Sequence, residues 1–600
     1  MKAQIEEITQ RIKDRSKKTR SRYIQLMKQS ENTMVSRGDL ACGNLAHAFA
    51  ACAEDEKVDL SGQTIPNIGI VTAYNDMLSA HKTYENYPNQ LRKYARENGG
   101  VAQVASGVPA MCDGVTQGQV GMELSLLSRD VIALSTAVGM SHQMFDAGIC
   151  LGICDKIVPG MMIGALKFGH LPFIFLPGGP MESGISNEEK ALFRRKYADG
   201  KIGRDELLKA ESASYHSAGT CTFYGTANSN QMLMEIMGVH LPGSSFITPK
   251  TKLRELLNEY SIKRLLQITK QKKEYTPLYE IITEESIVNA IVGLAATGGS
   301  TNHTIHLIAI ARAAGIIINW DDFDEVSNTV PLITRVYPNG SADINHFQAC
   351  GGMAYLIKTL RDDGFLNEDV KTVVGKGLEK YEQEPKLDKD GLIWIPGPVE
   401  SLDKDILRSV HDPFSKTGGL RCLTGNLGRS IIKVSAVLEE NQTVKARAEV
   451  FDDQDEVIEA FKKGRLNKDV IVVVKNQGAH SNGMPELHKL TPTLTLLQNQ
   501  GFKVALVTDG RMSGASGKVP AAIHLSPEGT MGGIISKIQT GDLIELDAIE
   551  GTLNCLNIED LKNRQSKSNE NPRSFGVGRE LFNSVRPLIS ASEEGASFIV

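Results

Sequence analysis

The sequence Gly152-Ile153-Cys154-Asp155-Lys156-Ile157-Val158-Pro159-Gly160-Met161 places a thiol, a carboxylate and an amine side by side, just before a Pro-Gly turn. Apolar stretches precede and follow it, so we expect the three polar groups to lie in a loop between buried elements. Such loops concentrate binding and catalytic groups. A soft sulfur ligand beside a hard oxygen ligand indicates iron or zinc chemistry with an acid substrate nearby. The alternative is a buried structural cysteine followed by a surface ion pair.

Short apolar runs alternate with helix-like segments on both sides of this loop. Strands are predicted at residues 68–72, 101–108 and 173–176, and helices at residues 121–138 and 186–197. The predicted strands end in glycine-rich or polar loops, and this alternation is typical of a parallel sheet. Ligands gather at the carboxyl ends of the strands in such a sheet. Three segments are placed there by this pattern: Cys112-Asp113, Cys154-Asp155-Lys156 and Thr220-Cys221.

The chain has 600 residues, which is too long for one hydrophobic core. We predict an N-terminal helical arm over residues 1–60 and a three-layer α/β domain with a parallel sheet over residues 61–395. Residues 396–600 have a more β-rich composition and are predicted as a barrel-like α/β domain. A polar stretch rich in Pro and Gly, residues 386–403, marks the boundary. The predicted fold class is therefore α/β throughout.

The N-terminal arm combines an apolar spacing with a run of basic residues. Ile5, Ile8 and Ile12 repeat at helical spacing. The basic run at residues 11–22 is interpreted as a solvated helix face that could pack on a partner subunit. A phosphate-attracting arm is the alternative.

Charge and hydropathy exclude several classes of protein. Lys and Arg number 66 against 71 Asp and Glu, a formal net charge of −5, so nucleic acid is not the expected partner. The most apolar candidate span, residues 161–176, is broken by Lys167 and His170, so no membrane crossing is expected. The charged first 29 residues resemble neither a secretory signal nor a transit peptide. The expected location is the cytoplasm.

The nine cysteines are scattered along the chain and include no Cys-x-x-Cys pair. An odd, dispersed set does not indicate a disulfide framework. Three of them, Cys112, Cys154 and Cys221, lie in glycine-flanked loops of the predicted α/β domain. Thiolates that converge from separate loops can hold an iron–sulfur cluster and leave one iron without a protein ligand. An open iron is a Lewis acid, which suits removal of a β-hydroxyl group.

Dehydration of a hydroxy acid also requires removal of the proton next to the carboxylate. This step needs a positioned base and a group that holds the dianionic enolate. Asp113 and Asp155 are candidates to hold a divalent cation for this purpose, and Arg511 or Lys518 could face the acid directly.

Ordered motifs along the chain resemble the dihydroxy-acid/sugar-acid dehydratase family, from about Ile68 to the C-terminal region. The motifs are Cys112-Asp113-Gly114, Gly121-Met122-Glu123-Leu124-Ser125, Cys154-Asp155-Lys156, Gly219-Thr220-Cys221-Thr222, Gly298-Gly299-Ser300-Thr301-Asn302, Gly483-Met484-Pro485-Glu486 and Asp509-Gly510-Arg511-Met512-Ser513-Gly514. The residues around Cys112, Pro485 and Lys518 are similar to those of the branch that acts on a phosphorylated sugar acid and uses a 4Fe-4S cluster. The resemblance therefore implies a hydro-lyase with a small phosphorylated substrate, and we expect a homodimer. An unphosphorylated sugar acid or dihydroxy acid is the alternative substrate.

The resemblance also implies roles for individual residues. Cys154 and Cys221 match the cluster ligands of the family. Asp113, Asp155 and Lys156 match residues that hold magnesium (Mg²⁺) in the dihydroxy-acid branch, where the lysine is a carbamate. The implied catalytic residues are Ser513, which matches the serine proposed as the base, and Lys156 as the next candidate.

Two positions depart from the dihydroxy-acid branch. Its third cluster cysteine aligns with Ala80, so Cys112 is our candidate for the third ligand. A magnesium-binding glutamate aligns with Gln477, so we expect a magnesium site to lack one carboxylate.

Two other classes are less consistent with the sequence. An iron–sulfur electron carrier or sensor would have compact cysteine spacing and would close off every iron. A dinucleotide enzyme would show Gly-x-Gly-x-x-Gly after its first strand, with an acidic residue further on.

Overall fold

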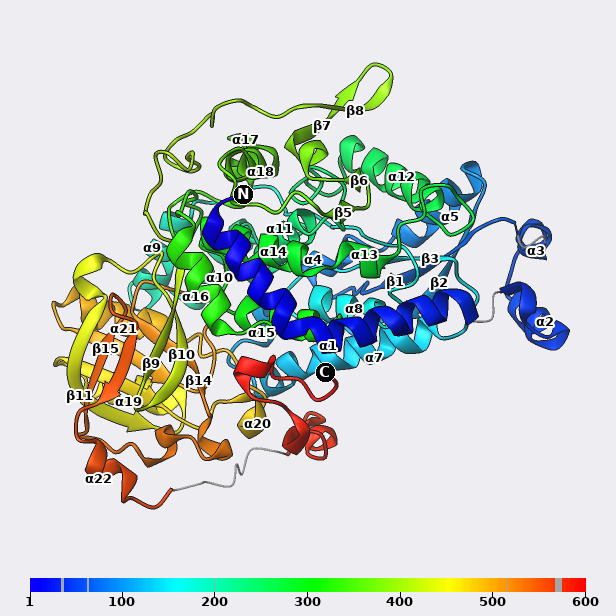
Figure 1. The fold of residues 1–600 in the computed structure, drawn as a ribbon. Coiled ribbons are helices and arrows are strands. Elements are labelled where there is room, and N and C mark those ends of the chain that lie inside the picture. The colour runs from blue at the N-terminus through cyan, green and yellow to red at the C-terminus, as the bar shows by residue number, and fades with distance from the viewer. Residues whose placement is uncertain (34–36, 62–63, 199, 515, 567–574) are drawn as a thin grey trace.

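The computed structural model describes residues 1–600 except 34–36, 62–63, 199, 515 and 567–574. Two sheets organise the chain (Figure 1): a four-stranded parallel sheet in the first half and a closed eight-stranded barrel in the second. The predicted α/β class is confirmed, with a parallel sheet followed by a barrel-like region.

The parallel sheet is the middle of three layers. Its strands are β1 Asn67–Thr72, β2 Val101–Gly107, β3 Ala147–Leu151 and β4 Phe173–Phe175. They lie in the order β2-β1-β3-β4, and each neighbouring pair is parallel. Parallel crossovers are right-handed. The chain moves along the sheet in one direction from β1 to β2 and in the opposite direction from β2 to β3 and on to β4. Helix α5 (Tyr87–Glu97) therefore lies on one face of the sheet, and α7 (Ser125–Met140) and α8 (Ile157–Leu166) lie on the other.

The strand order reverses between β1 and β3. A crevice at the carboxyl ends of the strands at such a reversal is the usual ligand site of an open α/β sheet. The Cys154-Asp155-Lys156 segment lies in the short connection between the end of β3 and the start of α8. The topology therefore places these three polar groups at the crevice.

The connection from β3 ends at α8, and α8 packs closely against α7. A Cβ atom on Gly160 would lie 2.5 Å from the Arg129 carbonyl oxygen, and one on Gly164 would lie 2.7 Å from that of Ala133. Every residue of α8 is buried. Glycine allows the two backbones to approach this closely, so the loop before α8 is carried on a rigid helix pair.

The N-terminal helix α1 (Ala3–Thr33) packs along α14 and α16 of the same chain (Figure 1). The three isoleucines predicted to form its apolar face are buried. Arg15 Nη1 lies 2.7 Å from Asp322 Oδ2, and the buried Arg20 guanidinium donates to the Ala314 carbonyl at 2.9 Å. The prediction of a solvated basic face was therefore wrong for these two arginines, because each binds acceptors within its own chain.

The barrel closes in the order β10-β14-β13-β12-β11-β15-β16-β9. Its strands are β9 Leu420–Gly425, β10 Gly428–Lys433, β11 Thr443–Phe451, β12 Val470–Val474, β13 Val504–Thr508, β14 Ala521–Ser526, β15 Leu543–Asp547 and β16 Thr552–Cys555. Alternate residues of β12 enter two different apolar clusters. Ile471 and Val473 join the cluster made by the other strands, whereas Val470 and Val472 pack with α19 (Gln454–Lys462) and α21 (Leu490–Asn499).

Helices make up most of the remaining regular secondary structure. Those of the first 370 residues are α2 Cys42–Ala50, α3 Glu54–Ser61, α4 Ser79–Lys82, α6 Asp113–Thr116, α9 Asn187–Ala198, α10 Arg204–Ser214, α11 Thr226–Ile236, α12 Lys252–Gln267, α13 Leu278–Ile281, α14 Glu284–Thr297, α15 His303–Ala313, α16 Trp320–Thr329, α17 Ile344–Ala349 and α18 Gly352–Asp362. Two short helices, α20 Ala479–Asn482 and α22 Ile558–Lys562, belong to the second half. The two-stranded sheets are β5 Lys371–Thr372 with β6 Gly375–Lys376, and β7 Gln383–Asp388 with β8 Gly391–Pro396. None of the described helices is long and apolar enough to span a bilayer.

Candidate active site

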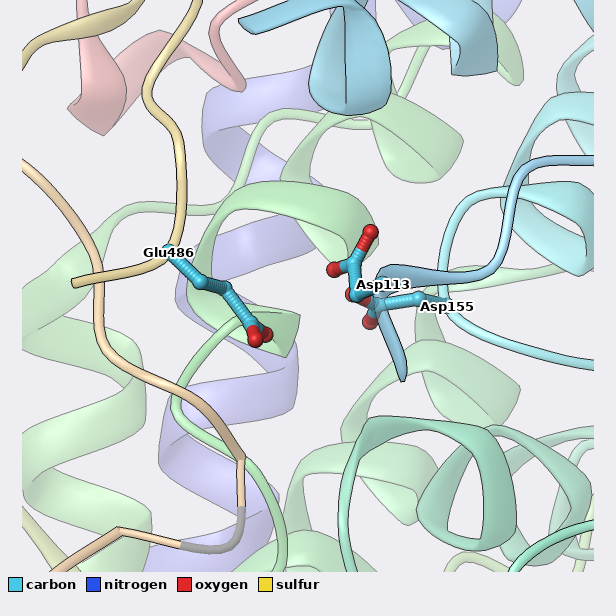
Figure 2. Close-up of side chains that lie close together, drawn as sticks. All are labelled: Asp113, Asp155 and Glu486. Carbon is cyan, nitrogen blue, oxygen red and sulfur yellow. The ribbon is translucent and has the colours of Figure 1, made fainter. Parts of the chain in front are cut away.

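Three carboxylates and two cations meet where the parallel sheet faces the barrel. The Lys156 ammonium, which is fully buried, donates to Asp113 Oδ2 and to Asp155 Oδ2. The Arg511 guanidinium, from the loop after β13, lies 3.0 Å from Asp113 Oδ2 and 2.9 Å from Glu486 Oε1. Figure 2 shows Glu486 approaching the aspartate pair from a separate segment of the chain. The site therefore draws its charges from both halves of the sequence.

With three carboxylates and two cationic side chains, this group is one positive charge short of neutrality. Burial opposes ionisation of Asp113, but Lys156 and Arg511 outweigh it and hold the pKa of this carboxyl well below its usual range. Burial and the neighbouring Asp113 raise the pKa of Glu486 to about 7. Burial also raises the pKa of Asp155. A bound divalent cation would relieve this repulsion and favour the charged carboxylates.

The carboxylates fit a hard divalent cation. Within the described part of the chain, Asp113, Asp155 and Glu486 are the one group of three candidate metal ligands whose ligand atoms all lie within 4.8 Å of one another. Asp155 Oδ1 is buried without a hydrogen-bond partner, and His306 Nε2 lies 4.0 Å from it. Carboxylate oxygens are the ligands that magnesium prefers. Lys156 could join them only without its proton, because an ammonium has no lone pair to offer.

Glu486 supplies the carboxylate that the sequence alignment appeared to lack. The Gln477 amide donates to the Asp452 carbonyl at 2.8 Å and accepts from Asn482 Nδ2 at 3.0 Å. Neither bond joins it to Asp113, Asp155 or Glu486. The alignment of Gln477 with a magnesium ligand stays a prediction, and Glu486 is the third carboxylate that the structure brings to the two aspartates. Glu486 stands in a motif that the sequence analysis quoted, but nothing in its spacing linked it to Asp113.

The three cysteines of the predicted cluster site lie near one another. A hydrogen bond from the Cys154 thiol lowers the pKa of Cys112 to about 7. This hydrogen bond, burial and the charges of Cys112 and Cys221 raise the pKa of Cys154 well above its usual value. Burial and the charge of Cys112 raise the pKa of Cys221 to about 12. The structure thus brings together thiols from three loops far apart in sequence.

The chemistry of this thiol set is that of a soft-metal site. Around one tetrahedral zinc the sulfurs would be only about 3.8 Å apart, given a Zn–S distance of about 2.3 Å. The sulfurs of Cys112, Cys154 and Cys221, all described residues, do not all lie within 4.8 Å of one another. Three thiolates from separate loops are a ligand set that an iron–sulfur cluster with one open iron can use. The Ala80 segment adjoins the same site, because the Ser79 carbonyl accepts from Gly219 N at 3.0 Å.

One helix holds two of the three cysteine loops. From α11, Asn230 Nδ2 donates to the carbonyls of Cys154 and Asp155 at 2.9 and 3.0 Å. Two residues earlier, Asn228 Nδ2 donates to the carbonyls of Cys221 and Phe223 at 2.8 Å each. Cys154 has a φ of 74°, a left-handed conformation that costs a non-glycine residue roughly 1–3 kcal/mol. Asn230 offsets part of this cost by satisfying the carbonyls of Cys154 and Asp155.

Ser513 lies in the loop after β13, next to the start of α11. A Cβ atom on Gly514 would lie 2.7 Å from the hydroxyl oxygens of Ser300 and Thr226, so the loop backbone packs directly on these residues. Ser513 is partly buried and lines a pocket with Thr301 and Lys433. Arg511, two residues earlier, forms ion pairs with Asp113 and Glu486.

Comparison with known proteins gives the family. Residues 65–381 match the N-terminal domain of the dihydroxy-acid/6-phosphogluconate dehydratases, and residues 405–596 match their C-terminal domain. The chain therefore belongs to the dihydroxy-acid/6-phosphogluconate dehydratase family, and it is a hydro-lyase in class.

Particular relatives extend this similarity over the full length. The phosphogluconate dehydratase of Pseudomonas aeruginosa is 54% identical over 99% of this chain and 98% of its own length. The phosphogluconate dehydratase of Escherichia coli K12 is 53% identical over 100% of both. The dihydroxy-acid dehydratase of Aquifex aeolicus is 32% identical over 88% of this chain and 93% of its own length.

Proposed function

We propose that this chain removes water from 6-phospho-D-gluconate to give 2-dehydro-3-deoxy-6-phospho-D-gluconate, the dehydration step of the Entner–Doudoroff pathway. The observation that carries the proposal is the full-length identity of 53–56% to proteins named phosphogluconate dehydratase. The dihydroxy-acid dehydratase relative is more distant, at 32%. The buried acidic and thiol groups supply chemistry that such a reaction needs.

In this proposal Cys112, Cys154 and Cys221 hold a 4Fe-4S cluster. When bound, the cluster supplies an iron with an open position, a Lewis acid for the departing C3 hydroxyl group. Asp113, Asp155 and Lys156 hold a magnesium ion, and we add Glu486 to this set because its carboxylate completes the group. Lys156 would serve as a ligand only in a deprotonated or carbamate form.

The proton at C2 goes to Ser513 in this proposal. An alcohol is a weak base unless a cation holds its alkoxide form. Arg511 and Lys156 occupy the neighbouring carboxylate site, and they orient those carboxylates through charge-assisted hydrogen bonds. Lys156 is the next candidate for the base.

The proposal also includes the larger organisation expected from the sequence. The cluster-binding domain is assigned to residues 61–395 and the barrel domain to residues 396–600, after an arm of residues 1–60. The family matches, which end at 381 and resume at 405, support this division. A cytoplasmic homodimer remains part of the proposal, and sedimentation of the purified chain tests the dimer.

Substrate competition tests the proposed function. Anaerobically purified enzyme should show a kcat/KM for 6-phosphogluconate at least about 10²-fold above that for D-gluconate, since a site that pairs with a charged group strongly disfavours analogues that lack it. A branched dihydroxy acid serves as the third substrate. Equal or higher kcat/KM for either unphosphorylated acid would overturn the proposal in favour of the alternative substrate class.

A further inference from the structure

His306, in the first turn of α15, lies beside the proposed magnesium site. Its side chain is buried, and its two ring nitrogens face different charged groups. Arg129 Nη1 lies 3.3 Å from Nδ1, and Asp155 Oδ1 lies 4.0 Å from Nε2. The ring therefore stands between a buried guanidinium and one of the three carboxylates of the site.

The contact with Arg129 fixes the protonation of this ring. A guanidinium has five N–H donors and no acceptor, so Arg129 must be the donor and His306 Nδ1 the acceptor. Because Nδ1 then carries no proton, the ring is neutral and its one proton is on Nε2. This N–H group faces Asp155 Oδ1, an atom that is buried without a hydrogen-bond partner among the described residues.

Arg129 is itself held by contacts outside the site. Its Nε donates to Asp130 Oδ1 at 3.0 Å, and its Nη2 donates to the Ala596 carbonyl at 2.8 Å. Asp130 Oδ2 in turn accepts from the backbone N–H of Phe598 at 2.8 Å. The end of the chain therefore fixes the guanidinium that orients the His306 ring.

We propose that His306 is a positioning residue of the magnesium site, and that its Nε2–H holds the Asp155 carboxylate in the orientation that binds the ion. This inference rests on the magnesium site of the proposed function. Asp155 Oδ2 accepts from the Lys156 ammonium, so the two oxygens of this carboxylate face different donors. The 4.0 Å contact is longer than a hydrogen bond. In a buried site of low dielectric, however, the N–H dipole still attracts the carboxylate.

Oriented ligands bind a metal more tightly, because less freedom is lost when the ion binds. Partners that orient a metal ligand without touching the ion typically contribute about 10–100-fold to metal affinity. His303, three residues earlier in α15, offers a matched comparison. It is also buried, but its Nε2 bonds to Ser229 Oγ at 2.8 Å.

Two replacements of similar shape separate the two contacts of the His306 ring. His306→Gln can place an amide N–H near the position of Nε2 and so can donate to Asp155. His306→Asn can place an amide oxygen near the position of Nδ1, so it keeps an acceptor for Arg129 but does not reach Asp155. A purely structural role favours asparagine, whereas the proposed positioning role favours glutamine. His303→Asn is the control.

The measurement is binding of Mn²⁺ to the anaerobically purified chain without substrate, followed by electron paramagnetic resonance and by displacement with Mg²⁺. Mn²⁺ prefers the same oxygen ligands as Mg²⁺. His306→Asn should weaken Mn²⁺ binding about 10–100-fold and raise the Mg²⁺ concentration needed for activity by a similar factor. Iron and sulfide content should not change. His306→Gln should recover most of the affinity, and His303→Asn should keep it even where thermal stability falls.

Several results would overturn the inference. They are unchanged Mn²⁺ affinity in His306→Asn, weaker binding in His306→Gln than in His306→Asn, or an equal loss of affinity in His303→Asn. If His306→Asn does not fold, a loss of tenfold or more in His306→Gln is the contradicting result. A wild-type chain that binds no Mn²⁺ would overturn the inference together with the magnesium site. A wild-type chain that binds Mn²⁺ but does not dehydrate 6-phosphogluconate would refute the proposed function separately.

Discussion

At the scale of single residues, Lys156 shows how the site balances buried charge. Its ammonium contacts Asp113 and Asp155, and Arg511 closes the other side through Asp113 and Glu486. Removing one partner of a buried ion group leaves an uncompensated charge, which typically costs about 3–5 kcal/mol. Variants at this site therefore need isosteric changes, so that function and folding are not lost together.

Glu486 is the residue that most directly tests the proposed magnesium site. Glu486→Gln keeps a hydrogen-bond acceptor for Arg511 but removes a negative charge. Loss of a ligand should raise the magnesium concentration needed for activity at least about tenfold, while iron and sulfide content stay unchanged. Gln477→Glu is the contrasting variant, and it should not increase magnesium affinity because the Gln477 side chain is bonded to Asp452 and Asn482 instead. Unchanged magnesium dependence in Glu486→Gln would remove Glu486 from the site.

Cys112 is proposed as the third cluster ligand because Ala80 has no sulfur. Cys112→Ala should lose iron and sulfide as completely as Cys154→Ala, since each removes one of three thiolates. Iron and sulfide analysis of anaerobically purified protein measures this. A Cys112→Ala protein with a full cluster spectrum would assign Cys112 to packing behind Asp113.

Ser513 is proposed as the base at C2. Ser513→Ala should keep iron content and thermal stability but lose about 10²–10⁴-fold in kcat, the usual contribution of a positioned base. Exchange of the substrate C2 hydrogen with solvent deuterium, followed by NMR, should stop in the variant. If exchange continues at the wild-type rate, another group takes the proton and Lys156 is tested next.

At the scale of elements, α11 is the part of the fold that holds the cysteine loops together. Its first turns carry Asn228 and Asn230, which bind the backbone carbonyls of the Cys221 and Cys154 loops. These contacts fix both loops to the same helix. The helix therefore links two proposed cluster ligands that are separated by 67 positions in the sequence, from 154 to 221.

Asn230→Ala tests this role of α11. The variant removes two hydrogen bonds and should lower the free energy of unfolding by about 1–3 kcal/mol, and it should also accelerate loss of iron. Asn289→Ala is a matched control, because Asn289 is a buried helical asparagine that donates to the Asn367 carbonyl at 2.9 Å. The control should lose similar stability and keep its iron. Equal iron loss in both variants would show that α11 has no special role.

The elements also show what sequence patterns could and could not predict. The buried strands β1 and β12 are apolar runs with turn signals at their ends, so local pattern was sufficient to predict them. The helix predicted over residues 121–138 buries only some of its leucines: Leu127 is buried, but Leu134 is 47% exposed. Contacts with α8 select a different face of α7, and periodicity alone does not reveal which neighbour a helix packs against.

At the scale of the whole molecule, the site forms only where the parallel sheet and the barrel meet. Asp113 and Lys156 come from loops at the sheet edge, whereas Glu486 and Arg511 come from the barrel half and pair with each other in a short bridge. Glu486, Asn230 and His306 therefore escaped the sequence analysis for one physical reason. Their roles depend on contacts between distant segments, and local spacing carries no information about those contacts.

We propose that these loops form the iron-dependent centre of a phosphogluconate dehydratase. The most direct test is anaerobic reconstitution of the wild-type chain with iron and sulfide, followed by a 6-phosphogluconate dehydration assay at each iron content. Formation of the 2-keto product should rise in proportion to bound cluster and should be absent from the iron-free chain. Full activity in the iron-free chain, or a fully loaded chain that leaves 6-phosphogluconate unchanged, would contradict it.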